Sequence, residues 1–144
     1  MHNVAKRKLR QGEIALGFGL HHLRSSAAPM LAGAAQHDYL FMDMEHGAFT
    51  VQEATQICIA SLCAGIAPVV RVCAGALDEA TRLLDNGALG IVVPHVDTKQ
   101  QAQRIADAFH YRRWEPGAGV DLRRSTRIWP RTCQRRRRRS TKKC

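Results

Sequence analysis

Short apolar runs alternate with amphipathic segments along the first 110 residues, and this alternation constrains the fold more than any other feature. The apolar runs indicate strands at 13–18, 39–43, 67–72 and 89–93. Helices are expected at 27–36, 51–64 and 77–85, and a fourth from position 99 to about position 110. Strand followed by helix, four times over with short connections, predicts an α/β fold whose parallel sheet is covered by helices.

Two of these helices begin with a recognisable capping pattern. Thr50 with Glu53, and Thr98 with Gln101, match a capping box, in which the two residues satisfy each other's backbone N–H groups. Gly65 follows the last turn of the first of these two helices, where a left-handed residue commonly ends a helix. These local signals place the helix ends independently of the apolar pattern.

Polar side chains stand at the carboxyl ends of the predicted strands. Asp43, Glu45 and His46 lie at and after the second strand, Arg71 closes the third, and His95 follows the fourth. Parallel strands joined by right-handed crossovers end on the same side of the sheet. Open sheets and barrels both bind ligands there, so we predict a functional site from these residues.

The residue types suit proton transfer beside a carbonyl group. A histidine next to carboxylates can act as a general base near neutral pH, and an arginine offers a planar fork for a carboxylate or an enolate. The structural alternatives stay open: His46 can be a simple hydrogen-bonding residue and Arg71 a solvated ion pair. Asp85 stands near a helix carboxyl end, where an acid is electrostatically unfavourable, and this indicates a specific partner. His21 and His22 are expected to be ordinary surface residues.

The net charge of +10 is concentrated at one end of the chain. Residues 1–110 contain nine Lys or Arg and ten Asp or Glu. Residues 111–144 contain thirteen Lys or Arg and two Asp or Glu. The composition therefore changes near Tyr111, from a near-neutral globular part to a basic tail. Such a tail can bind nucleic acid and other polyanions without sequence preference.

Cysteine spacing and hydropathy argue against several classes of protein. The five cysteines are odd in number and form no C-x-x-C pair, which argues against a disulfide framework or a zinc site. No apolar run reaches the roughly 18 residues of a membrane-spanning helix, and no signal-peptide pattern follows the basic start of the chain. We therefore expect a cytoplasmic protein without a membrane partner.

Three motifs carry a family resemblance: DMEHG at 43–47, VVRV at 69–72 and LLDNGALGIVVPHVDT at 83–98. Together with the following helix, they resemble the HpcH/HpaI family over about residues 9–111. The resemblance implies a partial TIM (β/α)8 barrel of about four βα units in residues 1–111, with an irregular basic tail at 112–144. It also implies a trimer or hexamer in the intact family.

The same resemblance implies an activity. Family members are class II, metal-dependent aldolases, that is, carbon–carbon lyases using Mg²⁺, Mn²⁺ or Co²⁺. They cleave 2-keto-hydroxy acids, such as 4-hydroxy-2-oxoheptanedioate, to pyruvate or a related keto acid and an aldehyde. Carried over by motif, His46 is the catalytic base, Arg71 binds pyruvate and its enolate, and Asp85 lies near His46 and orients it. Asp43 and Glu45 support the site.

The resemblance ends near Tyr111. Family members continue with Y-P-P-x-G-x-R-G, whereas this chain reads RRWEPGA after Tyr111. Back-translating RRWEPGA with one choice of GC-rich codons, and restoring one C before it, spells PPVGARG. We therefore interpret 112–144 as read out of frame and disordered. The family's metal-binding carboxylates would lie beyond this point, so we expect no metal bound by this chain and little or no lyase activity.

Two alternatives remain for the chain as a whole. One is a citrate-lyase-like acyl-CoA lyase, which would require further arginines for CoA that the sequence does not offer. The other is a noncatalytic polyanion-binding or nucleic-acid-binding protein, in which the basic tail acts and the half-barrel is a scaffold.

Overall fold

The computed structural model describes residues 3–109 of the 144-residue chain, so the expected tail at 112–144 lies outside the described residues. Helices and strands follow one another in this order: α1 Val4–Arg10, β1 Gly17–Leu20, α2 Ala28–Ala34, β2 Tyr39–Asp43, α3 Val51–Ala64, β3 Ala67–Arg71, α4 Leu77–Asp85, β4 Gly90–Val92 and α5 Lys99–Phe109. No helix within this range is long and apolar enough to cross a membrane.

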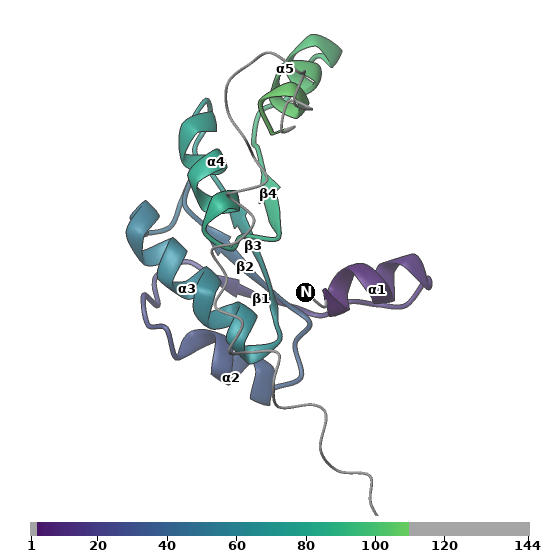
Figure 1. Ribbon diagram of the computed structural model, residues 1–144, viewed down its shortest axis with the longest axis vertical. Coiled ribbons are helices and arrows are strands. Elements are labelled where there is room, and N and C mark those ends of the chain that lie inside the picture. The colour runs from purple at the N-terminus through teal and green to yellow at the C-terminus, as the bar shows by residue number, and fades with distance from the viewer. Residues whose placement is uncertain (1–2, 110–144) are drawn as a thin grey trace, which may run out of the picture. The chain divides into compact units, whose positions relative to one another are not determined.

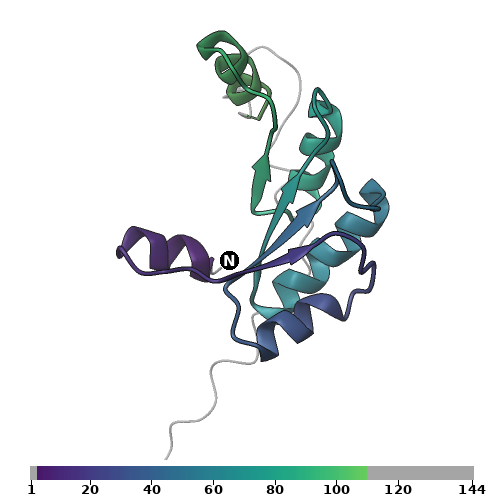
Figure 2. The same cartoon turned by 180° about the vertical axis from the view of Figure 1, so that it is seen from behind.

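The four strands form one parallel sheet in the order β1-β2-β3-β4. Helices α2, α3 and α4 lie on one face of the sheet, and α1 lies on the other (Figures 1 and 2). Each strand is followed by a helix, as the alternation predicted, and the α/β fold with four βα units is confirmed. All four strands therefore end on the same side of the sheet.

The core fills the space between the sheet and helices α2 to α4. Alternate side chains of a strand point to opposite faces, and Leu40 and Met42 of β2 are fully buried on the helix side. Ile57 from α3 packs into the same cluster. Tyr39 and Phe41, on the other face of β2, are only partly buried, so the described helices cover one face of this strand completely.

The ends of α3 follow the predicted capping pattern. The Glu53 backbone N–H donates to Thr50 Oγ1 at 3.3 Å, and the Thr50 N–H donates to Glu53 Oε2 at 2.9 Å. Gly65 ends the helix in the left-handed conformation, with φ 76°. Thr98 and Gln101 exchange the same pair of bonds before α5. Both predicted capping boxes are confirmed.

Removing the α3 cap gives a first testable expectation. Thr50→Ala should lower the free energy of unfolding by about 1 kcal/mol, because the Glu53 backbone N–H loses its acceptor and the Glu53 carboxylate loses the hydrogen bond from the Thr50 hydroxyl. Urea unfolding followed by far-UV circular dichroism measures this difference. Thr50→Ser keeps the hydroxyl and should stay close to the wild type; equal losses for Ala and Ser would contradict a capping role.

The start of the chain differs from the prediction. Residues 13–16 do not belong to the first strand, which begins at Gly17, and α1 was not predicted. The side chain of Asp38 contacts both regions. Its Oδ2 accepts the Leu16 N–H at 2.9 Å, in place of a strand partner, and it also accepts a bond from Lys8 Nζ of α1 at 2.8 Å. The hydrogen bond from Lys8 lowers the pKa of Asp38.

Candidate functional site

Asp43 and Arg71 lie side by side at the carboxyl ends of β2 and β3, because the parallel register pairs these two residues. Arg71 Nε donates to Asp43 Oδ1 at 2.9 Å, and Arg71 Nη2 donates to Oδ2, so the ion pair is bidentate. Asp43 is fully buried, whereas 26% of the Arg71 side chain is exposed. The hydrogen bond from Arg71 holds the pKa of Asp43 well below its usual range, and the same bond raises the pKa of Arg71. Both groups are therefore charged at neutral pH.

Asp43 also organises the loop that follows β2. Its Oδ1 accepts the backbone N–H groups of Glu45, at 3.0 Å, and of His46, at 3.2 Å. A side chain that bonds the backbone two and three residues ahead closes a tight turn. The turn places Glu45 and His46 around the ion pair.

Glu45 joins residues from three parts of the fold. Its Oε2 lies 3.3 Å from Arg71 Nη1 and 3.9 Å from His46 Nε2. Its Oε1 lies 3.1 Å from Nε2 of His95, which follows β4. The Glu45 side chain is 11% exposed, whereas His46 and His95 are 69% and 72% exposed. The site is thus a nearly covered ionic core with accessible imidazoles around it.

The structure adds His21 to this cluster. Its Nδ1 lies 3.4 Å from Asp43 Oδ2, although the sequence indicated an ordinary surface residue. The signal that could have found it is its position directly after β1, since every strand of a parallel sheet ends on the same side. His95, which the sequence left open, was placed at this side of the sheet by the same rule.

Gly47 marks the point where the loops after β1 and β2 touch. The Ala48 N–H donates to the His21 carbonyl oxygen at 2.9 Å. A Cβ atom at position 47 would collide with the backbone carbonyl oxygens of Asp43 and His21. The glycine of the D-x-E-H-G motif therefore allows a close approach of two backbones, which brings His21 to the site.

Arg71 can still bind a ligand while it holds its carboxylates. Of its five N–H groups, two donate to Asp43, and Nη1 faces Glu45. Nη1 and Nη2 each carry two N–H groups, and the described residues occupy at most one on each. At least one N–H on each of these two nitrogens is therefore available to a ligand. Two parallel N–H groups on a planar guanidinium match the two oxygens of a carboxylate, or the carboxylate and keto oxygens of a 2-keto acid.

A family model confirms the family resemblance of the sequence motifs. The model of the HpcH/HpaI aldolase/citrate lyase family matches residues 21–129. The chain belongs to this family. The match includes the D-x-E-H-G loop, Arg71 and His95, and it extends past Tyr111, where the sequence motifs had predicted that the resemblance ends.

Individual relatives agree with the family assignment. The chain is 33% identical over 126 residues to a 2-keto-3-deoxy-L-rhamnonate aldolase of Shigella sonnei (strain Ss046), covering 87% of this chain and 47% of that protein. It is 33% identical over 108 residues to a 4-hydroxy-4-methyl-2-oxoglutarate aldolase of Hapsidospora irregularis, covering 73% of this chain and 39% of that protein. The chain thus spans about half the length of the curated relatives it matches, or less.

A solved structure confirms the fold. The HpcH/HpaI aldolase from Desulfitobacterium hafniense DCB-2 matches with a TM-score of 0.74 and 26% identity, over 90% of this chain and 49% of that chain. This structural neighbour is a TIM-barrel aldolase, and the four-stranded sheet corresponds to part of such a barrel. The predicted partial TIM barrel is confirmed.

Asp85, predicted to orient His46, lies elsewhere. It is an exposed residue at the carboxyl end of α4, and residues 86–89 lead from there into the start of β4. His46 instead follows the end of β2. A crossover helix returns the chain to the amino ends of parallel strands, so Asp85 and His46 lie at opposite ends of the sheet. The predicted proximity of the two residues is not found within one chain.

The described residues do not fit the divalent metal that the family implies. No group of three or more His, Cys, Asp or Glu side chains among residues 3–109 is placed to share a metal ion. Asp43 is engaged on both oxygens by Arg71, and Glu45 has Arg71 on one oxygen and His95 on the other. We therefore assign no chemical step of this chain to a metal.

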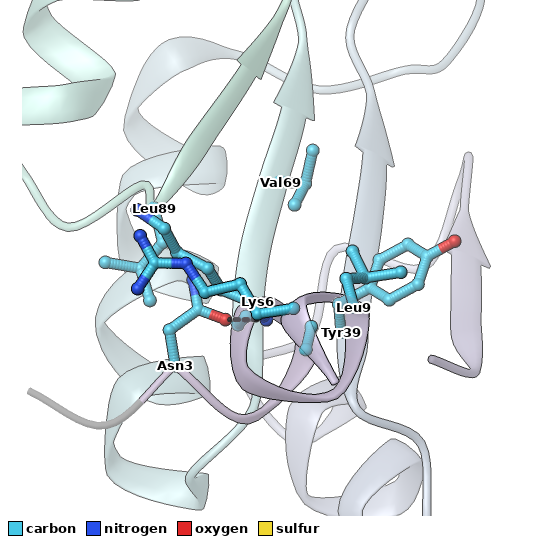
Figure 3. Close-up of a pocket in the computed structure, with 9 residues that line it drawn as sticks. Asn3, Lys6, Leu9, Tyr39, Val69 and Leu89 are labelled. Carbon is cyan, nitrogen blue, oxygen red and sulfur yellow. Dashed lines mark hydrogen bonds between the residues drawn. The ribbon is translucent and has the colours of Figure 1, made fainter. Parts of the chain in front are cut away.

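A hollow of about 500 Å³ lies at the opposite end of the sheet, between α1 and the amino ends of the strands. Figure 3 shows Lys6 and Leu9 of α1 facing Tyr39, Val69 and Leu89 across it. Parallel α/β folds bind substrates at the carboxyl ends of their strands. The described residues that line this hollow include no His, Asp or Glu.

Proposed function

We propose that the cluster around Arg71 is the keto-acid site of an aldolase that cleaves 2-keto-hydroxy acids to pyruvate, or a related keto acid, and an aldehyde. One observation carries the proposal: Arg71 is held by Asp43 and Glu45 and keeps N–H groups for a ligand, and the accessible His46 lies 3.9 Å from the Glu45 oxygen that faces Arg71. The names of the two relatives support it, since each names an aldolase of a 2-keto acid.

Each side chain has a role in this reaction. Arg71 binds the substrate carboxylate and C2 oxygen. His46 accepts the proton of the C4 hydroxyl through a water molecule. The C3–C4 bond then breaks, the aldehyde leaves, and the bond's electrons move to the C2 oxygen as an enolate that Arg71 stabilises. Returning the proton from His46 to C3 gives pyruvate. Asp43 and Glu45 hold Arg71 in place.

We further propose that full turnover needs groups outside the described residues. In the family, Mg²⁺, Mn²⁺ or Co²⁺ would supply Lewis-acid chemistry, and its carboxylate ligands would lie outside residues 3–109. Because the sequence indicates that residues 112–144 are out of frame, we propose that this chain binds a keto acid but cleaves little substrate. A homo-oligomer, a trimer or hexamer as in the family, is part of this proposal.

Arg71→Lys tests the site directly. We expect pyruvate affinity to fall tenfold to a hundredfold, an order-of-magnitude range, because an ammonium group cannot replace the fork that holds two carboxylates and a ligand together. Isothermal titration calorimetry of the full chain with pyruvate measures this loss. Coupled detection of pyruvate released from a 4-hydroxy-2-oxo acid, with each metal ion in turn, measures turnover.

Arg82→Lys is the matched control, because Arg82 is exposed on α4, outside the cluster. It should bind pyruvate as the wild type does. Equal binding by Arg71→Lys and the wild type would overturn the proposed site. Substrate cleavage that matches full-length aldolases would overturn the proposal that the chain turns over little. Polyanion binding by residues 112–144 stays a separate prediction, which their deletion would test.

A further inference from the structure

The ionic core of the site has the wrong net charge for an anionic ligand. Asp43 and Glu45 together carry two negative charges against the single positive charge of Arg71. A keto acid brings another negative charge to this group. Repulsion between like charges is stronger in a partly covered site than in water. Binding at Arg71 therefore calls for one more positive charge close to the carboxylates.

His95 is the imidazole best placed to supply that charge. Its Nε2 lies 3.1 Å from Glu45 Oε1, the oxygen turned away from Arg71. His46 Nε2 is 3.9 Å from Glu45, beyond hydrogen-bond distance. His21 lies 3.4 Å from Asp43, which already accepts four hydrogen bonds. The carboxylate with the fewest donors is thus Glu45, and His95 is its closest histidine.

The backbone at His95 has an unusual conformation. Its φ of 55° is in the left-handed region, which is uncommon for a residue other than glycine. Asparagine tolerates this conformation better than most residues. His95→Asn should therefore preserve the backbone conformation of the loop and remove only the imidazole ring, so this variant tests the role of the ring.

We propose that His95 is a positioning residue that takes up a proton when a keto acid binds at Arg71. Protonated His95 holds Glu45 by a charge-assisted hydrogen bond, and the guanidinium of Arg71 is then available to the ligand. The charged and titratable groups around His95 are Glu45 in direct contact, Arg71 and His46 through the other Glu45 oxygen, and Asp97 on its own loop. This inference rests on the proposed keto-acid site.

The test is isothermal titration calorimetry of the full chain with pyruvate at pH 7.5 and pH 6.0. Repeating each titration in buffers of different ionisation enthalpy gives the number of protons taken up on binding. For the wild type we expect about a tenfold gain in affinity at the lower pH and uptake of up to one proton, since one coupled proton gives at most tenfold per pH unit. His95→Asn should change less than about twofold between the two pH values. His95→Lys, with a permanent charge, should bind equally at both.

His22→Asn is the matched control, because His22 is an exposed neighbour of His21 and, among the described residues, forms no hydrogen bond or ion pair with Asp43 or Glu45. It should keep the pH dependence of the wild type. Proton uptake that persists in His95→Asn overturns the inference. Pyruvate binding that needs Arg71 but is independent of pH also overturns the inference and leaves the proposed function standing. Failure of the wild type to bind pyruvate at either pH overturns both.

Discussion

Replacing Asp43 with Asn should lower the free energy of unfolding by about 3 kcal/mol or more, because it removes one partner of a buried ion pair. Asp43 is fully buried and accepts two bonds from Arg71 and two from backbone N–H groups. An amide has one acceptor oxygen, and its NH₂ group would face the guanidinium. Pyruvate binding should be lost together with stability, since Arg71 loses its anchor.

Urea unfolding at pH 7 measures the loss, and Asp78→Asn is the matched control because Asp78 is an exposed residue of α4. The control should stay within about 0.5 kcal/mol of the wild type. Near-equal stability of Asp43→Asn and Asp78→Asn would show that the ion pair contributes little to the fold.

The same variant should change how stability depends on pH. The folded chain lowers the pKa of Asp43, mainly through the hydrogen bond from Arg71, so the unfolded chain binds more protons in acid. The contribution of Asp43 is complete above its ordinary pKa of about 3.9 and is lost as the pH falls below it. Between pH 5 and pH 2.5, Asp43→Asn should therefore lose less stability than the wild type. Equal losses would contradict the lowered pKa.

Gly47→Ala should destabilise the chain by about 2–3 kcal/mol and disturb the site. The added methyl group would collide with the carbonyl oxygens of Asp43 and His21, and backbone atoms cannot move aside as a flexible side chain can. Relief of this collision separates the loops after β1 and β2, so His21 moves away from Asp43. Urea unfolding and pyruvate titration together measure both effects.

Gly19→Ala is the control for Gly47→Ala. Gly19 belongs to β1, and a Cβ atom there would meet no atom of the described chain within 4 Å. Alanine restricts the unfolded chain more than glycine does, so Gly19→Ala should match or slightly exceed the wild type in stability. If both variants lost the same stability, the close contact at Gly47 would not be the cause.

Local signals in the sequence were sufficient for most of the fold. The bounds of β2, α3 and α4 agree with the expected ones, because an apolar run, a capping box and a glycine stop depend on residues close in the chain. The start of β1 failed for the opposite reason. Residue 16 is bound by the side chain of Asp38, 22 positions away, and no local pattern contains that contact.

The candidate site divides in the same way. The order of strands and helices alone predicts that Asp43, Arg71 and His95 gather at one end of the sheet. This order does not predict which of the side chains there contact one another. Register sets Asp43 beside Arg71, and the Gly47 contact brings in His21. The path of the loop after β4 brings His95 to Glu45.

The sequence by itself determined the family, the α/β class and the end of the sheet that carries the polar residues, because motifs, periodicity and chain order contain this information. Only the tertiary structure decided that His95 and His21 contact the carboxylates and that Asp85 lies at the opposite end from His46. A few ångströms separate a hydrogen bond from no interaction. Such distances depend on strand register and loop paths, which arise only when the whole sheet has assembled.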